Sequence, residues 1–112
     1  MTNLAVRAFP ETLRSLAFGS ISGTYAAIGT GLTNPSRLFF LQNLTNATIT
    51  FSFDGTHDHL ILPSNGFFLF DVTSDRTDTG GSFCIAQGTI IYVKGSPGSG
   101  SVYLSTFYGA NG

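Results

Sequence analysis

Alternation of apolar and polar side chains with a period of two constrains this chain more than any other feature. In residues 48–53, Ile49, Phe51 and Phe53 alternate with threonine and serine. Because successive side chains point to opposite faces of a strand, this pattern predicts a half-buried strand. The strand ends at Asp-Gly, a turn dipeptide, and no long segment shows the 3.6-residue period of an amphipathic helix. We therefore expect an all-β chain.

Short segments of the same kind recur along the chain, separated by turn residues at spacings of roughly ten residues. The predicted strands are 15–21, 25–32, 37–44, 48–53, 59–62, 67–72, 89–94 and 101–108. About eight short antiparallel strands are typical of a β-sandwich, a jelly roll or a small barrel. We expect a single β-sandwich or jelly-roll-like domain over residues 1–112, with residues 1–14 as an N-terminal arm. Residues 47–72 are expected to form a three-stranded meander, and residues 95–100 to close a hairpin.

Several predicted strands, including 37–44 and 67–72, are apolar on both faces. Two packed sheets bury only one face of each sheet, so the second faces need a cover, either from loops and the N-terminal arm or from another chain. Charged residues make up 10% of the chain, against roughly 25% in an ordinary soluble domain, and interface cores are depleted in charge. We therefore favour a cover by sister copies or a larger assembly. The residues expected at this interface are Leu4, Val6, Phe9, Leu13, Phe39, Phe40, Phe68, Phe70, Tyr103 and Phe107.

Charge and hydropathy argue against two classes of partner. The net charge is −1 and the five basic residues are scattered, whereas nucleic-acid binding needs clustered Lys and Arg. No apolar run approaches the ~18 residues of a membrane-spanning helix, so no membrane partner is expected. Residues 1–7 lack the apolar core of a signal peptide, which predicts assembly in the cytoplasm. The single cysteine, Cys84, lies in an apolar stretch and is interpreted as a buried small side chain.

One cluster contains side chains of the kinds that hold metal ions. Asp54, His57, Asp58 and His59 lie within one short segment, and the two histidines point to the same side if that segment is extended. A polar turn explains these residues more simply. Ser99, between two glycines, reads as part of a loop rather than as a nucleophile. We therefore expect no metal, no cofactor and no enzymatic activity, with a metal-dependent enzyme centred on His57 and His59 as an alternative.

Residues 34–63 place an apolar run, a polar turn, a strand, Asp-Gly and an aliphatic strand ending in proline in succession. This order resembles small β-rich virion structural proteins of tailed bacteriophages, and residues 93–95 and 99–105 fit the same type. The resemblance covers roughly residues 15–109. It implies a virion protein, most simply a capsid decoration or cement protein that binds the major capsid protein as a homo-oligomer and stabilises the head shell. A neck, collar, tail or baseplate component is the alternative that it leaves open.

A function of another class is a carbohydrate- or receptor-binding sandwich. Such sites need exposed aromatic rings beside polar loops. The rings could come from Tyr25, Tyr92, Tyr103 and Tyr108, although the chain contains no tryptophan. Binding to a glycan array, lost on substitution of a tyrosine, would support this alternative.

Overall fold

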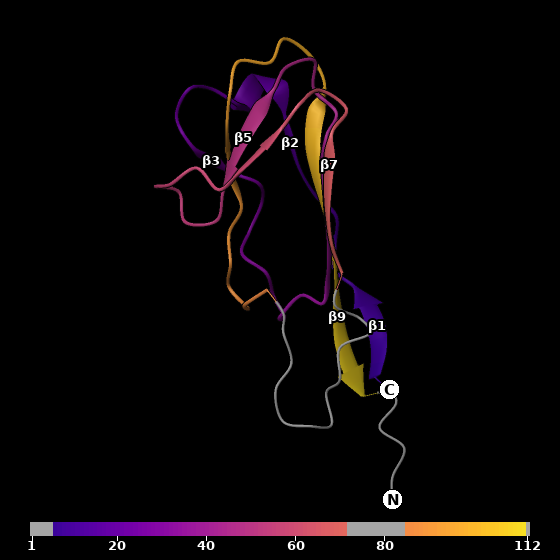
Figure 1. Cartoon of the computed structure of the whole chain (residues 1–112). Coiled ribbons are helices and arrows are strands. Elements are labelled where there is room, and N and C mark those ends of the chain that lie inside the picture. The colour runs from indigo at the N-terminus through magenta and orange to yellow at the C-terminus, as the bar shows by residue number, and fades with distance from the viewer. Residues whose placement is uncertain (1–5, 72–84, 112) are drawn as a thin grey trace, which may run out of the picture.

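Two antiparallel sheets make up the part of the chain that the computed structural model describes, residues 6–71 and 85–111, with backbone alone for 6–8, 110 and 111 (Figure 1). Sheet A contains β1 (Val6–Pro10), β2 (Arg14–Ala17), β4 (Leu38–Asn43), β7 (Phe67–Asp71) and β9 (Ser101–Asn111). Sheet B contains β3 (Ala26–Ala27), β5 (Ile49–Ser52), β6 (Leu60–Leu62) and β8 (Tyr92–Lys94). The one helix in these residues is a 3₁₀ turn, η1 (Phe18–Ser20), and none is long and apolar enough to cross a membrane. The expected all-β sandwich is confirmed.

Strand β9 pairs with three other strands of sheet A. The order of the sheet is β1-β9-β4-β7, and β2 also pairs with β9. Sheet B has the order β3-β8-β5-β6. Because β1 pairs only with residues 107–111, this end of β9 lies far from β3 and β5 (Figure 1). The molecule is consequently elongated, with extents of 55 × 23 × 20 Å.

The inward faces of the two sheets form the hydrophobic core. Phe39 and Leu41 of β4 and Ile49 and Phe51 of β5 are all fully buried. Burying a side chain of this size contributes roughly 1.5–3 kcal/mol, so this layer is the main stabilising element of the fold. The whole cluster is Ile21, Ile28, Phe39, Leu41, Ile49, Phe51, Leu62, Ile91, Val93, Val102 and Leu104.

The expected meander over residues 47–72 is wrong. Strands β5 and β6 pair in sheet B, whereas β7 crosses to sheet A and pairs with β4. The crossing follows a turn in which Gly66 N–H donates to Pro63 O (2.8 Å) and Asn65 has a positive φ of 65°. Asn65 N–H then donates to the carbonyl of Asn43 at the end of β4 (2.8 Å). This contact outside the local sequence directs β7 into sheet A.

The expected hairpin at residues 95–100 is also wrong, because β8 lies in sheet B and β9 in sheet A. Gly100, immediately before β9, has a positive φ of 88°. A Cβ atom there would lie 2.1 Å from the carbonyl oxygen of Leu44, so only glycine fits. The connection is held to the neighbouring turn by Gly98 N–H, which donates to Asn46 Oδ1 (2.7 Å).

One extra residue interrupts the edge strand that β1 and β2 form along β9. Pro10 lies opposite Phe107 and Arg14 opposite Leu104, so three residues of the edge strand face two of β9. Such a β-bulge shifts the alternation of faces by one residue, and Arg14 therefore points inward. Part of the predicted N-terminal arm thus forms a strand of sheet A, while residues 1–5 lie outside the described part.

Candidate interaction surface

Apolar side chains occupy most outward positions on three adjacent strands of sheet A, with the polar Gln42 and Ser105 between them. The outward residues of β7, Phe67 and Leu69, are 62% and 50% exposed. The register places Phe40 of β4 opposite Leu69, and the ring centroids of Phe40 and Phe67 are 5.5 Å apart. We name this surface the outer apolar face. Its members are Leu38, Phe40, Phe67, Leu69, Tyr103 and Phe107.

The outer apolar face continues from β4 onto β9 and carries little charge. Leu38 lies opposite Phe107, and Phe40 lies opposite Ser105. Among the outward-facing positions described on β4, β7 and β9, Asp71 at the end of β7 is the one charged residue. Contiguous exposed apolar surface with depleted charge is characteristic of protein interaction sites.

The predicted interface is only partly located on this surface. Phe40, Tyr103 and Phe107 lie on the outer apolar face, as the interface hypothesis requires. Phe67 and Leu69, its most exposed members, were not among the predicted residues. Both are apolar on a strand that is apolar on either side, so alternation alone gave no signal for which face points outward.

Three predicted interface residues face the interior instead. Phe39 is fully buried in the core, so its assignment to an interface is wrong. Phe68 and Phe70 are half-buried and pack against that core, with the Phe68 ring edge-on to Phe39 at 6.5 Å. The strand pairing with β4 sets this orientation, because it places the even-numbered residues of β7 on the same side as Phe39.

The four N-terminal interface candidates are dispersed. The Phe9 ring stacks on Tyr108 of β9 with centroids 5.6 Å apart. Leu13, in the bulge, is exposed. Val6 is the first residue of β1 and pairs with β9, and Leu4 lies outside the described residues.

The four residues considered as metal ligands, Asp54, His57, Asp58 and His59, lie in a hydrogen-bonded turn. Asp54 Oδ1 accepts from the N–H groups of Thr56 (2.8 Å) and His57 (2.9 Å), and Asp54 Oδ2 lies 2.9 Å from His57 Nδ1. The ring nitrogen Nδ1 of His59 accepts from Phe53 N–H (3.0 Å). These contacts already engage the carboxylate and one nitrogen of each imidazole. Within residues 6–71 and 85–111, no group of three or more His, Cys, Asp or Glu residues is arranged to hold a metal ion.

Hydrogen bonds to Asp54 lower the pKa of its carboxyl, chiefly the bond from His57 N–H, followed by those from the His57 ring and Thr56 N–H. A carboxyl with a lowered pKa contributes stability above its ordinary value of about 3.9 and loses that contribution as the pH falls. The Asp54 turn is therefore expected to be ordered at neutral pH and to loosen in acid.

Replacing Asp54 with alanine is expected to increase hydrogen exchange at the amides of Thr56 and His57 several-fold at neutral pH, because both lose their acceptor. In the unaltered chain, protection of these amides above that of a free peptide should fall below about pH 4. NMR-detected exchange measures both effects. Asp58→Ala is the control, since Asp58 accepts from Tyr25 and pairs with Lys94 instead. Equal exchange rates of the Thr56 and His57 amides in the two variants would contradict the assignment of Asp54 as their acceptor.

The four tyrosines of the carbohydrate alternative do not converge. Tyr25 donates its hydroxyl to Asp58, and Lys94 Nζ lies 4.6 Å from the centre of the Tyr25 ring. Tyr92 packs beside Gly55 on sheet B. Tyr103 lies on the outer apolar face and Tyr108 against Phe9. No common aromatic platform is formed by these rings.

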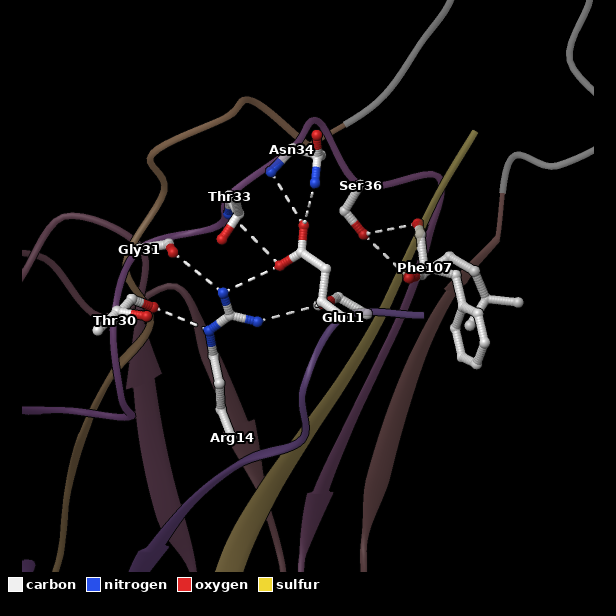
Figure 2. Close-up of polar contacts among 10 residues, drawn as sticks. Glu11, Arg14, Thr30, Gly31, Thr33, Asn34, Ser36 and Phe107 are labelled. Atoms are coloured by element: carbon white, nitrogen blue, oxygen red, sulfur yellow. Dashed lines mark hydrogen bonds and ion pairs between the residues drawn. The ribbon is translucent and has the colours of Figure 1, made fainter. Parts of the chain in front are cut away.

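A buried ion pair fixes the loop that follows β3 (Figure 2). Arg14 Nη2 lies 3.0 Å from Glu11 Oε1, and their side chains are only 8% and 7% exposed. Arg14 also donates to the carbonyls of Thr30 (2.9 Å) and Gly31 (3.0 Å). Glu11 Oε2 accepts from the N–H and side-chain amide of Asn34 (2.9 and 3.2 Å). Burial alone would raise the pKa of Glu11, but the bonds from Arg14 and Asn34 outweigh it and lower the pKa.

A groove of about 460 Å³ opens beside this ion pair. Glu11 and Arg14 lie in its wall, but their charged groups are engaged with each other and with residues 30–34. The groove is therefore explained by a structural network that joins the bulge to the loop after β3. Sequence reasoning missed this network because its partners are brought together by the bulge.

No protein-family model, curated protein or solved structure matches the chain.

Proposed function

We propose that the chain is a non-enzymatic structural protein of a tailed-bacteriophage virion, most simply a decoration protein that binds and stabilises the head shell. The outer apolar face is the observation that carries the proposal. Phe67 and Leu69 are 62% and 50% exposed, and both lie beside Phe40 on the next strand. A surface of this kind is stabilised when another protein covers it.

The arrangement also supports a role in an assembly of many copies. The outer apolar face lies on a sheet whose opposite face is anchored by the core, so it presents its side chains on a rigid support. Aromatic side chains buried at the centre of an interface supply most of its binding energy. Repetition of one such contact over a symmetric shell would reinforce the shell at every copy.

Quantitative mass spectrometry of purified virions, from the phage that encodes the chain, tests the proposal. A decoration protein should be present in numbers comparable to the major capsid protein. A count of a few dozen copies or fewer would assign it to the neck, tail or baseplate. Absence from purified particles would overturn the virion role.

Phe40→Ser should weaken binding to undecorated head shells by about 30-fold, as expected for loss of a central aromatic contact. Sedimentation of the purified variant with the shells measures this effect, and its thermal unfolding shows whether the fold is retained. Ile61→Ser is the matched control, because Ile61 is 62% exposed but lies on sheet B. Equal binding of the two folded variants would show that the outer apolar face is not the docking surface.

A further inference from the structure

Open edges of β-sheets invite pairing with another strand, and three of the four edges described here are blunted. Strand β3 has two residues, and β6 has three and ends before Pro63. The edge formed by β1 and β2 contains Pro10 and the bulge at residues 11–13. Very short strands, proline and bulges are the features by which proteins block edge-to-edge association.

Strand β7 is the exception. It has five residues, Phe67–Asp71, without proline, lysine or a bulge, and among the described residues it pairs only with β4. Its burial alternates regularly, with Phe67 and Leu69 outward. Residues 67–70 are all apolar, and Asp71 at the end of the strand is its one charged residue.

The hydrogen-bond pattern shows which backbone groups this edge presents. Asn43 N–H donates to Gly66 O (2.9 Å), so the backbone of residue 66 faces β4. Backbone groups of an antiparallel strand point alternately to its two sides. The N–H and C=O groups of Phe67 and Leu69 therefore point away from β4, toward the open edge.

We infer that β7 pairs antiparallel with β7 of a second copy, about a two-fold axis at Phe68. This register sets Phe67 of each copy opposite Leu69 of the other. Residues 67 and 69 are the ones whose backbone groups point to the edge, so each pair can exchange two hydrogen bonds. Sheet A then continues across the dimer, and the two outer apolar faces become one surface.

A second copy fits this edge better than an unrelated strand because the edge is complementary to itself. A two-fold axis brings the same patch of both subunits together, so the donors and acceptors at residues 67 and 69 match automatically. The facing side chains form two Phe–Leu pairs, and no charged side chain stands within residues 67–69. The inference rests on the proposed function, since it names the partner through which copies associate on a particle.

The test introduces charged side chains at the paired positions. The unaltered chain should sediment as a dimer. Phe67→Lys/Leu69→Lys should raise the dissociation constant of this dimer by about 100-fold or more, because lysine then faces lysine in both pairs. Phe67→Glu/Leu69→Glu should behave alike. An equimolar mixture of the two variants should form a heterodimer, which also shows that both are folded. Ile61→Lys, with the same 62% exposure on sheet B, should remain dimeric.

A monomeric unaltered chain, or lysine variants that dimerise as well as it does, would overturn the inference. A mixture that fails to form heterodimers would also overturn the register. These outcomes are separate from a failure of the proposed function, which is absence from purified virions. A chain that is abundant on particles but monomeric in solution and unaffected by these substitutions would retain the first proposal and lose the second.

Discussion

Arg14→Ala is expected to lower the free energy of unfolding by about 3 kcal/mol, because it leaves the Glu11 carboxylate buried without its counter-charge. The variant also removes the donors to the carbonyls of Thr30 and Gly31. Urea unfolding followed by circular dichroism measures the loss. Lys94→Ala is the control, since the Lys94–Asp58 ion pair is partly exposed and should contribute less than about 1 kcal/mol. Equal losses in the two variants would show that burial adds nothing to the Arg14 pair.

The pH dependence gives an independent check on the same ion pair. The pKa of Glu11 is lowered in the folded chain, so its contribution is complete above its ordinary value of about 4.3 and is lost as the pH falls. Without Arg14, burial opposes ionisation and the contribution is smaller at neutral pH. The difference in stability between the unaltered chain and Arg14→Ala should therefore narrow between neutral pH and about pH 3. A constant difference would exclude this electrostatic account.

Asn43→Ala is expected to cost about 3 kcal/mol or more, because one fully buried side chain serves five hydrogen bonds. Its amide donates to the carbonyls of Ala47 (2.8 Å), Leu62 (3.0 Å) and Pro63 (3.0 Å). Its oxygen accepts from Thr45 N–H (3.0 Å) and the Thr45 hydroxyl (2.6 Å). Alanine leaves groups of these partners unpaired at both crossings, from sheet A to sheet B after β4 and back to sheet A after β6.

Two asparagine variants sharpen this prediction. Asn43→Asp keeps the shape but removes the donors and sets a carboxylate against three carbonyls, so it should destabilise at least as much as alanine. Asn46→Ala, three residues along the same turn, removes one exposed acceptor and should cost about 1 kcal/mol or less. Thermal and urea unfolding of the three variants measure the order. Asn43→Ala no more destabilising than Asn46→Ala would contradict a central role for Asn43.

The two proposed interactions use different parts of sheet A. The outer apolar face supplies area, whereas the β7 edge supplies directional hydrogen bonds and a register. Edge pairing would bring Phe40, Phe67 and Leu69 of two copies into one larger patch. The copies would then bind an assembly through a joint surface, which makes dimerisation and docking cooperative.

Local pattern was sufficient for the secondary structure wherever alternation and turn residues agreed. Residues 48–53 were predicted as a strand and contain β5, and residues 37–44 contain β4. The segment 25–32 shortened to β3 because residues 28–32 bond irregularly to residues 88–91, as in Ile28 N–H to Ile91 O (2.7 Å). Turn chemistry also predicted the bend at Asn65, but it could not specify which sheet the next strand joins.

Three properties of this chain can be read from its residues alone: it is all-β, poor in charge, and richer in apolar strand faces than two sheets can bury. Each of these properties follows from composition and from a period of two, which are local. The pairing of strands far apart in the sequence places Phe39 in the core and turns Phe67 and Leu69 outward, and among the described strands it leaves β7 paired with β4 alone. When a strand is apolar on both sides, its own sequence does not indicate which side faces the core. Long-range pairing, fixed here by Asn43 and by the register with β4, selects that face.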